Sequence, residues 1–148
     1  MLSSKAGRPV RMVMSREEVF RASGPTVGSH TKIRMGAKRD GTISAAEASV
    51  HYQAGAFKGA PIGRAVETFF SAYTIENIRV DSYDVCDNRA KVAAYRSPGA
   101  PMACLAAEGI INKLAEKLDI DPIELRMTNA VRDGDESRMG TKYGRIGL

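Results

Sequence analysis

Two arginines stand in segments rich in glycine and proline, where a guanidinium group can serve an anionic ligand. Arg96 lies in residues 95–101, which read YRSPGAP, just before a predicted helix that starts near Met102. The N–H groups of a helix N-terminus favour anions, and the planar arginine fork adds donors. Arg64 follows Gly63 at the start of another predicted helix. The alternative stays open that both are ordinary surface arginines, since arginines are mostly exposed.

The other reactive side chains form no complete catalytic set. His30 and His51 have no metal-ligand spacing to each other or to a cysteine, so we interpret them as structural or surface residues. Cys86 and Cys104 are too few for a zinc site or a disulfide scaffold, and we expect both to be reduced. The chain has no nucleophile elbow, Walker loop or dinucleotide fingerprint. Motif chemistry alone therefore predicts no direct metal ligand and no catalytic residue.

The elements that must position the arginines mix strands and helices irregularly. Apolar alternation predicts strands at 8–14, 31–38, 43–52 and 77–85. Helical spacing and capping signals predict helices at 15–22, 64–73, 102–118 and 121–131. The turn containing Asp40-Gly41 joins the second and third strands as a hairpin, with a bulge near Ala45. The pattern indicates an α+β fold, a mixed or antiparallel sheet with a hairpin packed by a few helices.

The helix at 102–118 has the clearest apolar face. The residues that we assign to this face are Cys104, Ala107, Ile111, Leu114 and Leu118. The polar, glycine-rich stretch 132–148 follows the last helix without an apolar period, and we expect it to be a loose tail of a single domain spanning 1–148.

Composition excludes several classes of protein. The 148 residues are 43% hydrophobic and 26% charged, which is ordinary for a globular domain. The net charge of +5 comes from the first 40 residues, where nine Lys and Arg face three Asp and Glu. Those basic residues alternate with apolar ones, as Lys32 and Arg34 do, which favours the wet face of a strand over a nucleic-acid surface. We find no membrane span and no signal peptide, and expect a cytoplasmic protein without nucleic-acid or membrane partners.

The order of several motifs resembles the molybdenum-binding large subunit of the xanthine dehydrogenase/aldehyde oxidase family, over about residues 5–148. The matching pieces are GRPVR at 7–11, SREE at 15–18, DGTI at 40–43, Tyr73, Asn77-Ile78, YRSPGAP at 95–101, Glu108, and DPIELR at 121–126 with Asn129. Single pieces are common, but the arginine loop followed about 25 residues later by the last motif is specific to this family.

The resemblance implies a fragment of a molybdenum hydroxylase, part of a larger molybdenum-binding domain. Such enzymes are oxidoreductases that act on small molecules, either aldehydes or N-heterocycles, through a molybdopterin cofactor that carries the redox chemistry. Their electrons leave through [2Fe–2S] clusters to FAD on partner subunits or domains. The resemblance also implies an oligomeric parent enzyme.

The resemblance assigns roles residue by residue. Arg96, Ser97 and Gly99 match the loop that contacts the molybdenum cofactor. Arg64 matches the arginine that orients the substrate in xanthine-oxidising members, and Pro98 stands where those members place a stacking phenylalanine. The proline puts purine stacking in doubt, and the absence of cysteine at Ser97 argues against copper and carbon monoxide oxidation.

Other parts of the family site are missing from these residues. The base glutamate of a Gly-x-Gly-Glu motif lies far downstream in relatives, and a Gly-Phe-Gly-Gly loop lies upstream. We therefore expect no catalytic residue in this fragment and no activity from the isolated chain. The alternative is a stand-alone binding or interaction domain that reuses the fold without a cofactor.

Overall fold

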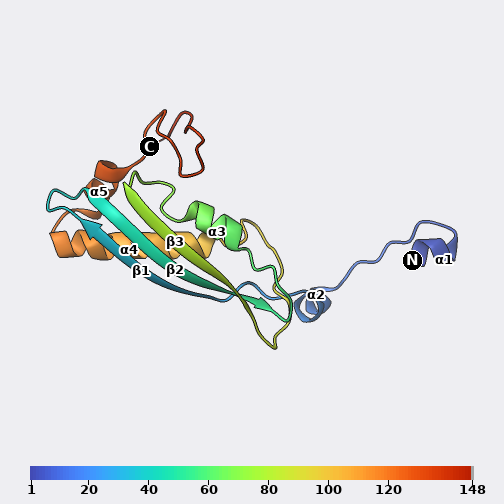
Figure 1. Ribbon diagram of the computed structural model, residues 1–148. Helices are drawn as coiled ribbons and strands as arrows, with labels where there is room; N and C mark the ends of the chain where they lie inside the picture. The colour runs from blue at the N-terminus through green and yellow to red at the C-terminus, as the bar shows by residue number, and fades with distance from the viewer. Residues whose placement is uncertain (148) are drawn as a thin grey trace.

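A computed structural model describes residues 1–147 and contains one three-stranded sheet with five helices (Figure 1). The elements follow in the order α1 (Leu2–Ala6), α2 (Arg16–Ala22), β1 (Ser29–Ala37), β2 (Ile43–Gly55), α3 (Ile62–Thr68), β3 (Asn77–Cys86), α4 (Ala100–Leu118) and α5 (Pro122–Asn129). The strands lie in the order β1-β2-β3; β2 is antiparallel to β1 and parallel to β3. This mixed sheet with its helices confirms the predicted α+β class.

The predicted hairpin forms between β1 and β2. The Asp40 carboxylate accepts the Thr42 N–H at 2.9 Å, and Gly41 adopts a φ of 88° that few other residues tolerate. The pairing shifts between Gly36 and Ala37, because Gly36 faces Ala45 whereas Ala37 faces Ile43. The predicted bulge near Ala45 is therefore confirmed.

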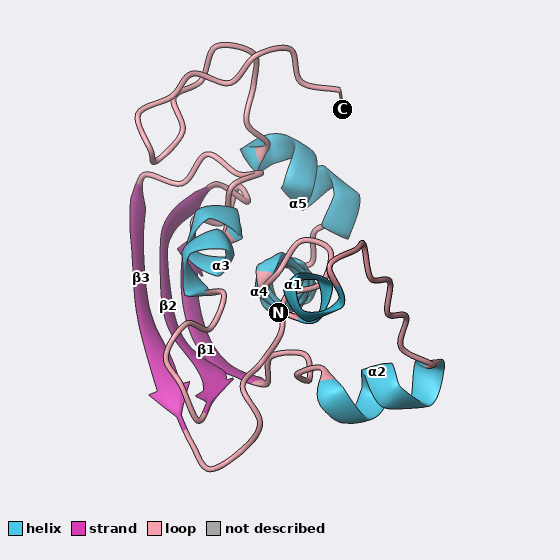
Figure 2. Cartoon of the chain, turned by 90° about the vertical axis from the view of Figure 1, so that its right-hand side faces the viewer, coloured by secondary structure: helices cyan, strands magenta, loops and turns pink. Residues whose placement is uncertain are grey.

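Helices α3 and α4 cover one face of the sheet, as Figure 2 shows. The main core lies between that face and these two helices. From Ala46 to Ala54 the buried residues of β2 alternate along the strand, and they are Ala46, Ala48, Val50, Tyr52 and Ala54. Lys32 and Arg34 of β1 lie on the opposite, solvent-facing side, as the alternation predicted. A second cluster joins α4 to α5 through residues that include Tyr73, Ile111 and Leu125.

Helix α4 buries a slightly different stripe from the predicted one. Its buried residues are Ala103, Ala107, Ile111 and Ala115. Cys104 is exposed, so its assignment to the apolar face was wrong. The predicted and the observed sets of core-facing residues share Ala107 and Ile111. Helical spacing alone does not decide whether Ala103 or Cys104 faces the core in the first turn of the helix.

Two local predictions at the N-terminal side and in the middle of the chain need correction. Residues 8–14 pair with no other segment in the described part of the chain, so the predicted strand is absent. The helix expected at 64–73 spans Ile62–Thr68, and turns follow it.

Helix α2 has the predicted capping box, in which Ser15 and Glu18 each accept the other's N–H.

The segment after α5 contacts the body through long side chains. The Arg138 guanidinium donates to the carbonyls of Val66 and Phe69 near the end of α3, where lone carbonyls need donors. The Tyr143 hydroxyl donates to the Ser71 carbonyl at 2.7 Å. Looseness of residues 132–148 stays a prediction.

Candidate functional site

The segment that carries Arg96 enters the N-terminus of α4 through two left-handed residues. Ser97 has a φ of 54° and Gly99, the N-cap, has a φ of 83°. No side chain caps the helix, and the Met102 N–H has no hydrogen-bond partner among residues 1–147. Arg96 and Ser97 are both exposed beside this terminus. The helix start therefore offers an unpaired amide and a nearby guanidinium to an anionic group.

Tyr52 of β2 anchors the segment that carries Arg96 through a hydrogen bond. The side chain of Tyr52 is fully buried in β2, and its hydroxyl donates to the Gly99 carbonyl at 2.8 Å. Burial raises the pKa of Tyr52 from 10.0 to about 12, so the hydroxyl keeps its proton at neutral pH. Tyr52 was not predicted as a site residue. The apolar alternation of β2 predicts that Tyr52 is buried, and a buried tyrosine hydroxyl needs a hydrogen-bond partner. The sequence could therefore have indicated that Tyr52 anchors another segment, although not which one.

Gly99 also ties the Arg96 segment to the start of α3. A Cβ on Gly99 would lie 2.3 Å from the Pro61 carbonyl oxygen, so only glycine permits this close approach. Pro61 is the N-cap of α3, the helix that carries Arg64. The two arginine-bearing segments are thus packed together, although their guanidinium groups do not contact each other.

Arg64 and Pro98 differ in exposure. The Arg64 side chain is 77% exposed and forms an ion pair with Glu67 at 3.0 Å, one turn along α3. Such an exposed pair contributes at most about 1 kcal/mol, so a ligand can replace it readily. Pro98 is half-buried between Ser97 and the buried Gly99.

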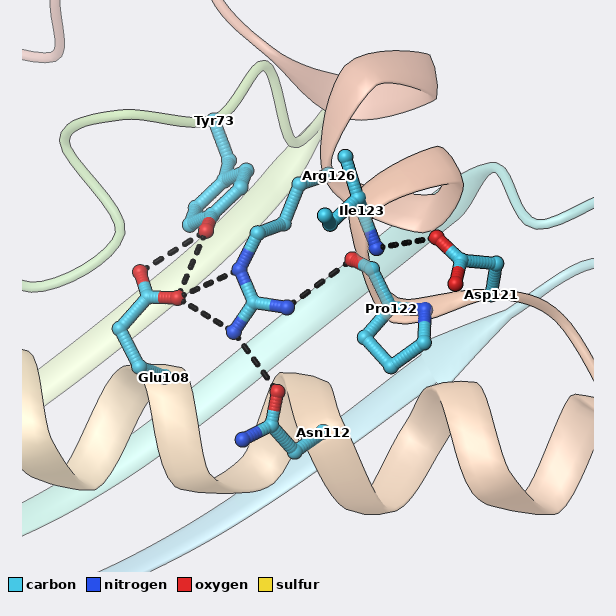
Figure 3. A network of polar contacts seen from close by, with 7 residues as sticks. All are labelled: Tyr73, Glu108, Asn112, Asp121, Pro122, Ile123 and Arg126. Atoms are coloured by element: carbon cyan, nitrogen blue, oxygen red, sulfur yellow. Dashed lines mark hydrogen bonds and ion pairs between the residues drawn. The ribbon is translucent and has the colours of Figure 1, made fainter.

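A network of polar side chains joins α4 to α5 and to the segment before β3 (Figure 3). Glu108 of α4 accepts the Tyr73 hydroxyl at 2.8 Å and the Arg126 Nε–H at 2.9 Å. Arg126 also donates to the Asn112 side chain at 2.8 Å. Burial raises the pKa of Tyr73 to about 12, and the hydrogen bond to Glu108 adds to that rise. This network fixes the position of α4 relative to α5.

The rest of the 121–129 motif is structural as well. Asp121 accepts the N–H groups of Ile123 and Glu124 and so caps α5. Asn129 is buried and connects α5 to the hairpin turn, because it accepts the Ile43 N–H at 2.8 Å and donates to the Gly41 carbonyl at 2.9 Å.

The remaining reactive side chains lie apart from the arginine segments. His51 stacks on Tyr83 with ring centroids 4.6 Å apart, on the sheet face opposite the helices. Cys86 and Cys104 are free and exposed. Within residues 1–147 no group of three or more metal-ligating side chains comes together, and no helix is long and apolar enough to cross a membrane. Within residues 1–147 the two arginine segments therefore offer hydrogen-bond donors, and no histidine lies beside them to serve as a catalytic acid or base.

The fold and the open helix terminus define a small α+β domain suited to hold an anionic ligand. The profile of the molybdopterin cofactor-binding domain family matches residues 1–130. The chain therefore belongs to that family, and the predicted resemblance to xanthine dehydrogenases and aldehyde oxidoreductases is confirmed.

Individual relatives agree with this assignment. The large molybdopterin subunit of nicotinate dehydrogenase from Eubacterium barkeri is 33% identical over 95% of the chain. Aldehyde oxidoreductase from Megalodesulfovibrio gigas is 33% identical over 90% of the chain. The solved aldehyde oxidoreductase from Desulfovibrio gigas superposes with a TM-score of 0.82 at 31% identity, over 95% of this chain and 16% of that one.

The chain corresponds to only part of each relative. It spans 34% of the nicotinate dehydrogenase subunit and 15% of the aldehyde oxidoreductase sequence. These relatives are molybdenum-dependent oxidoreductases, and the chain resembles a fragment of them.

The donors present fit an anionic organic cofactor. Among residues 1–147 the Met102 N–H and the Arg96 guanidinium have no hydrogen-bond or ion-pair partner, whereas Gly99 is buried against Pro61 and Tyr52. None of these groups is a metal ligand of the usual kinds, so they suit contacts to the organic part of molybdopterin.

Proposed function

We propose that this chain contributes one wall of the cofactor and substrate site in a larger molybdenum hydroxylase. The observation that supports the proposal most is the open N-terminus of α4, with Arg96 beside it, in a chain of the molybdopterin cofactor-binding family. Molybdopterin, when bound, supplies the redox chemistry, and iron–sulfur and FAD subunits or domains receive the electrons.

The residues of this chain bind the cofactor and orient the substrate. Arg96, Ser97 and the backbone at Gly99 hold the cofactor by hydrogen bonds, with Tyr52 keeping the segment in place. Arg64 and Pro98 line the substrate side, where the exposed guanidinium donates hydrogen bonds to an oxo or carboxylate group. The substrate class is a small aldehyde or N-heterocycle. The two free, exposed cysteines suit a reducing compartment, which we take to be the cytoplasm.

The test uses the full-length subunit with Arg96 replaced by alanine. We expect the molybdenum content per subunit to fall, with retention weakened about 10- to 100-fold as for other supporting contacts at metal sites. Metal analysis of the purified subunit measures this directly, and kcat should fall on every substrate.

Arg39→Ala is the matched control, because Arg39 is an exposed arginine in the hairpin turn. It should leave molybdenum content and kcat unchanged. Full cofactor content and full activity in Arg96→Ala would contradict the proposal, provided that circular dichroism shows the same fold in both variants.

A further inference from the structure

Two histidines that lie far apart in the sequence meet on the face of the sheet opposite α3 and α4. His30 of β1 and His51 of β2 are partners across the antiparallel strands, and their ring centroids lie 6.1 Å apart. Residues opposite each other in such a pair direct their side chains to the same face. On the other side of His51, the Tyr83 ring stacks on the imidazole with centroids 4.6 Å apart. The sheet register therefore creates a histidine pair that the spacing in the sequence does not reveal.

A carboxylate shares a cavity with the two imidazoles. His30, His51 and Asp87 line a cavity of about 330 Å³. The buried Nδ1 atom of His51 and the buried Oδ1 atom of Asp87 have no hydrogen-bond partner among residues 1–147. The other Asp87 oxygen accepts the Gln53 amide N–H at 2.6 Å and lies 3.7 Å from Arg89, so the carboxylate is held in place. Buried polar atoms without a partner are rare in proteins, so this pair of atoms points to a function.

The separation of the two imidazoles suits a shared metal ion. A Zn–N bond is about 2.0–2.1 Å long, which places the metal about 3.2 Å from the centroid of the ring. Two imidazoles on one metal therefore have centroids about 5.2 Å apart at the tetrahedral angle and about 6.4 Å apart at a straight angle. The observed 6.1 Å lies between these values. Because the His30 side chain is exposed, its ring has room to turn toward the tetrahedral geometry.

Asp87 is placed to orient His51 in such a site. A histidine that binds a metal through one ring nitrogen almost always donates the N–H of the other nitrogen to a carboxylate, a carbonyl or a water. With Nε2 of His51 as the ligand, its Nδ1 carries the proton. The unpaired Oδ1 of Asp87 in the same cavity is then the acceptor, directly or through one water.

We propose that His30 and His51 bind one Zn²⁺ ion, with Asp87 as the positioning residue for His51 and with water in the remaining coordination positions. Imidazole is a preferred ligand of zinc. Two protein ligands agree with the absence of any group of three metal-ligating side chains within residues 1–147, and they make the ion exchangeable. Both ligands and the carboxylate belong to this chain, so the site needs nothing from the rest of a larger subunit. The proposal does not depend on the proposed enzymatic function.

The test titrates the full chain with zinc chloride alone, by calorimetry in a buffer that does not bind metals. We expect one ion per chain. His30→Ala should weaken binding at least about tenfold, because the second imidazole of a chelating pair binds as an intramolecular ligand. His51→Ala should act in the same direction, and circular dichroism checks the fold of both variants. Cys86→Ser is the control for zinc on a thiol, because Cys86 is exposed next to Asp87 but does not line the cavity, and it should leave the affinity unchanged.

The role of Asp87 is tested separately. Asp87→Asn should weaken zinc binding about 10- to 100-fold, as loss of the carboxylate behind a metal-bound histidine does. Asp81→Asn is the matched control, because it makes the same charge change on the same strand at a carboxylate that pairs with Arg79, and it should leave the affinity near its original value. In nitrogen NMR spectra, saturating zinc should shift Nε2 of His51 while Nδ1 keeps its proton. The signal of that proton should move upfield in Asp87→Asn, which a merely structural role would not cause.

Three results would overturn the proposal. The first is a zinc dissociation constant above about 1 mM for the unchanged chain. The second is a His30→Ala variant that binds zinc as tightly as the unchanged chain, which would place the ion elsewhere. The third is an Asp87→Asn variant that binds zinc as tightly as Asp81→Asn, which would remove Asp87 from the site.

Discussion

Arg126 reaches from α5 to α4, and its donors are shared among a carboxylate, a side-chain amide and a backbone carbonyl. The acceptors are Glu108, Asn112 and Pro122, at 2.8 to 2.9 Å. The side chain is 27% exposed, so the ion pair with Glu108 is shielded more than an open surface pair. At the residue scale, the motif that marks the family most specifically thus supports the fold and does not line the candidate site.

The Arg64 side chain is far less constrained than that of Arg126, because among residues 1–147 it pairs with a single exposed carboxylate, that of Glu67. We predict that Arg64→Ala in the full-length subunit lowers kcat/KM by about 10- to 150-fold on substrates with an oxo or carboxylate acceptor. The basis is a hydrogen bond to a charged group, which contributes about 1.5–3 kcal/mol, at 1.4 kcal/mol per tenfold. Plain aldehydes should be affected little, and steady-state kinetics on both substrate classes measures the difference.

The control for Arg64 is Glu67→Ala, which frees the guanidinium without removing it. It should leave kcat/KM near its original value on both classes. Loss of molybdenum in Arg64→Ala, or equal loss on all substrates, would contradict a role in substrate orientation.

Gly99, the N-cap of α4, and Gly109, inside that helix, lie in contrasting surroundings, which makes a paired prediction at the scale of the element. Gly109 is in the exposed helix interior, and a Cβ there meets nothing within 4 Å. Gly109→Ala should raise the free energy of unfolding by about 0.5–1 kcal/mol, because alanine has the higher helix propensity. Urea denaturation of the isolated chain measures the change.

Gly99→Ala should act in the opposite direction and more strongly. Its φ of 83° disfavours a side chain, and the new Cβ would lie 2.3 Å from the Pro61 carbonyl oxygen. We expect a loss of about 2 kcal/mol or more, from backbone strain and overpacking together. A neutral Gly99→Ala variant would show that the contact between the Arg96 segment and α3 is not as close as described.

The elements that could be predicted are those whose signals lie close together in the sequence. The Asp40-Gly41 turn, the Ser15 capping box and the Asp121 cap each depend on residues within a few positions, and each is present. The strand at 8–14 failed because a strand needs a partner, which alternation does not reveal. The link from Tyr52 to Gly99 spans 47 positions, and only the fold brings those residues together.

At the scale of the whole molecule, two core clusters meet along α4, and each contains a buried tyrosine. Tyr52 belongs to the cluster between the sheet and the helices α3 and α4. Tyr73 belongs to the cluster around α4 and α5. Both hydroxyls donate to acceptors on or next to α4, namely the Gly99 carbonyl and the Glu108 carboxylate. Loss of either phenolic proton therefore weakens the attachment of the longest helix.

We predict that the molecule loses stability in alkali because of these two tyrosines. Burial raises the pKa of each from 10.0 to about 12, and the bond to Glu108 contributes at Tyr73. Between these values the folded chain binds more protons than the unfolded chain, so the free energy of unfolding falls as pH rises. The contribution is complete below about pH 10 and is lost as pH passes 12, with at most about 2–3 kcal/mol for each tyrosine.

Urea denaturation of the chain at intervals between about pH 9 and pH 12 measures this slope. Tyr52→Phe and Tyr73→Phe should each flatten the slope, and the double variant should flatten it most, since the two sites lie in separate clusters. Tyr83→Phe is the matched control, because Tyr83 is 49% exposed on the open face of the sheet and should leave the slope unchanged. If Tyr83→Phe flattened the slope as much as Tyr52→Phe, general alkaline repulsion and not the buried hydroxyls would cause the loss of stability.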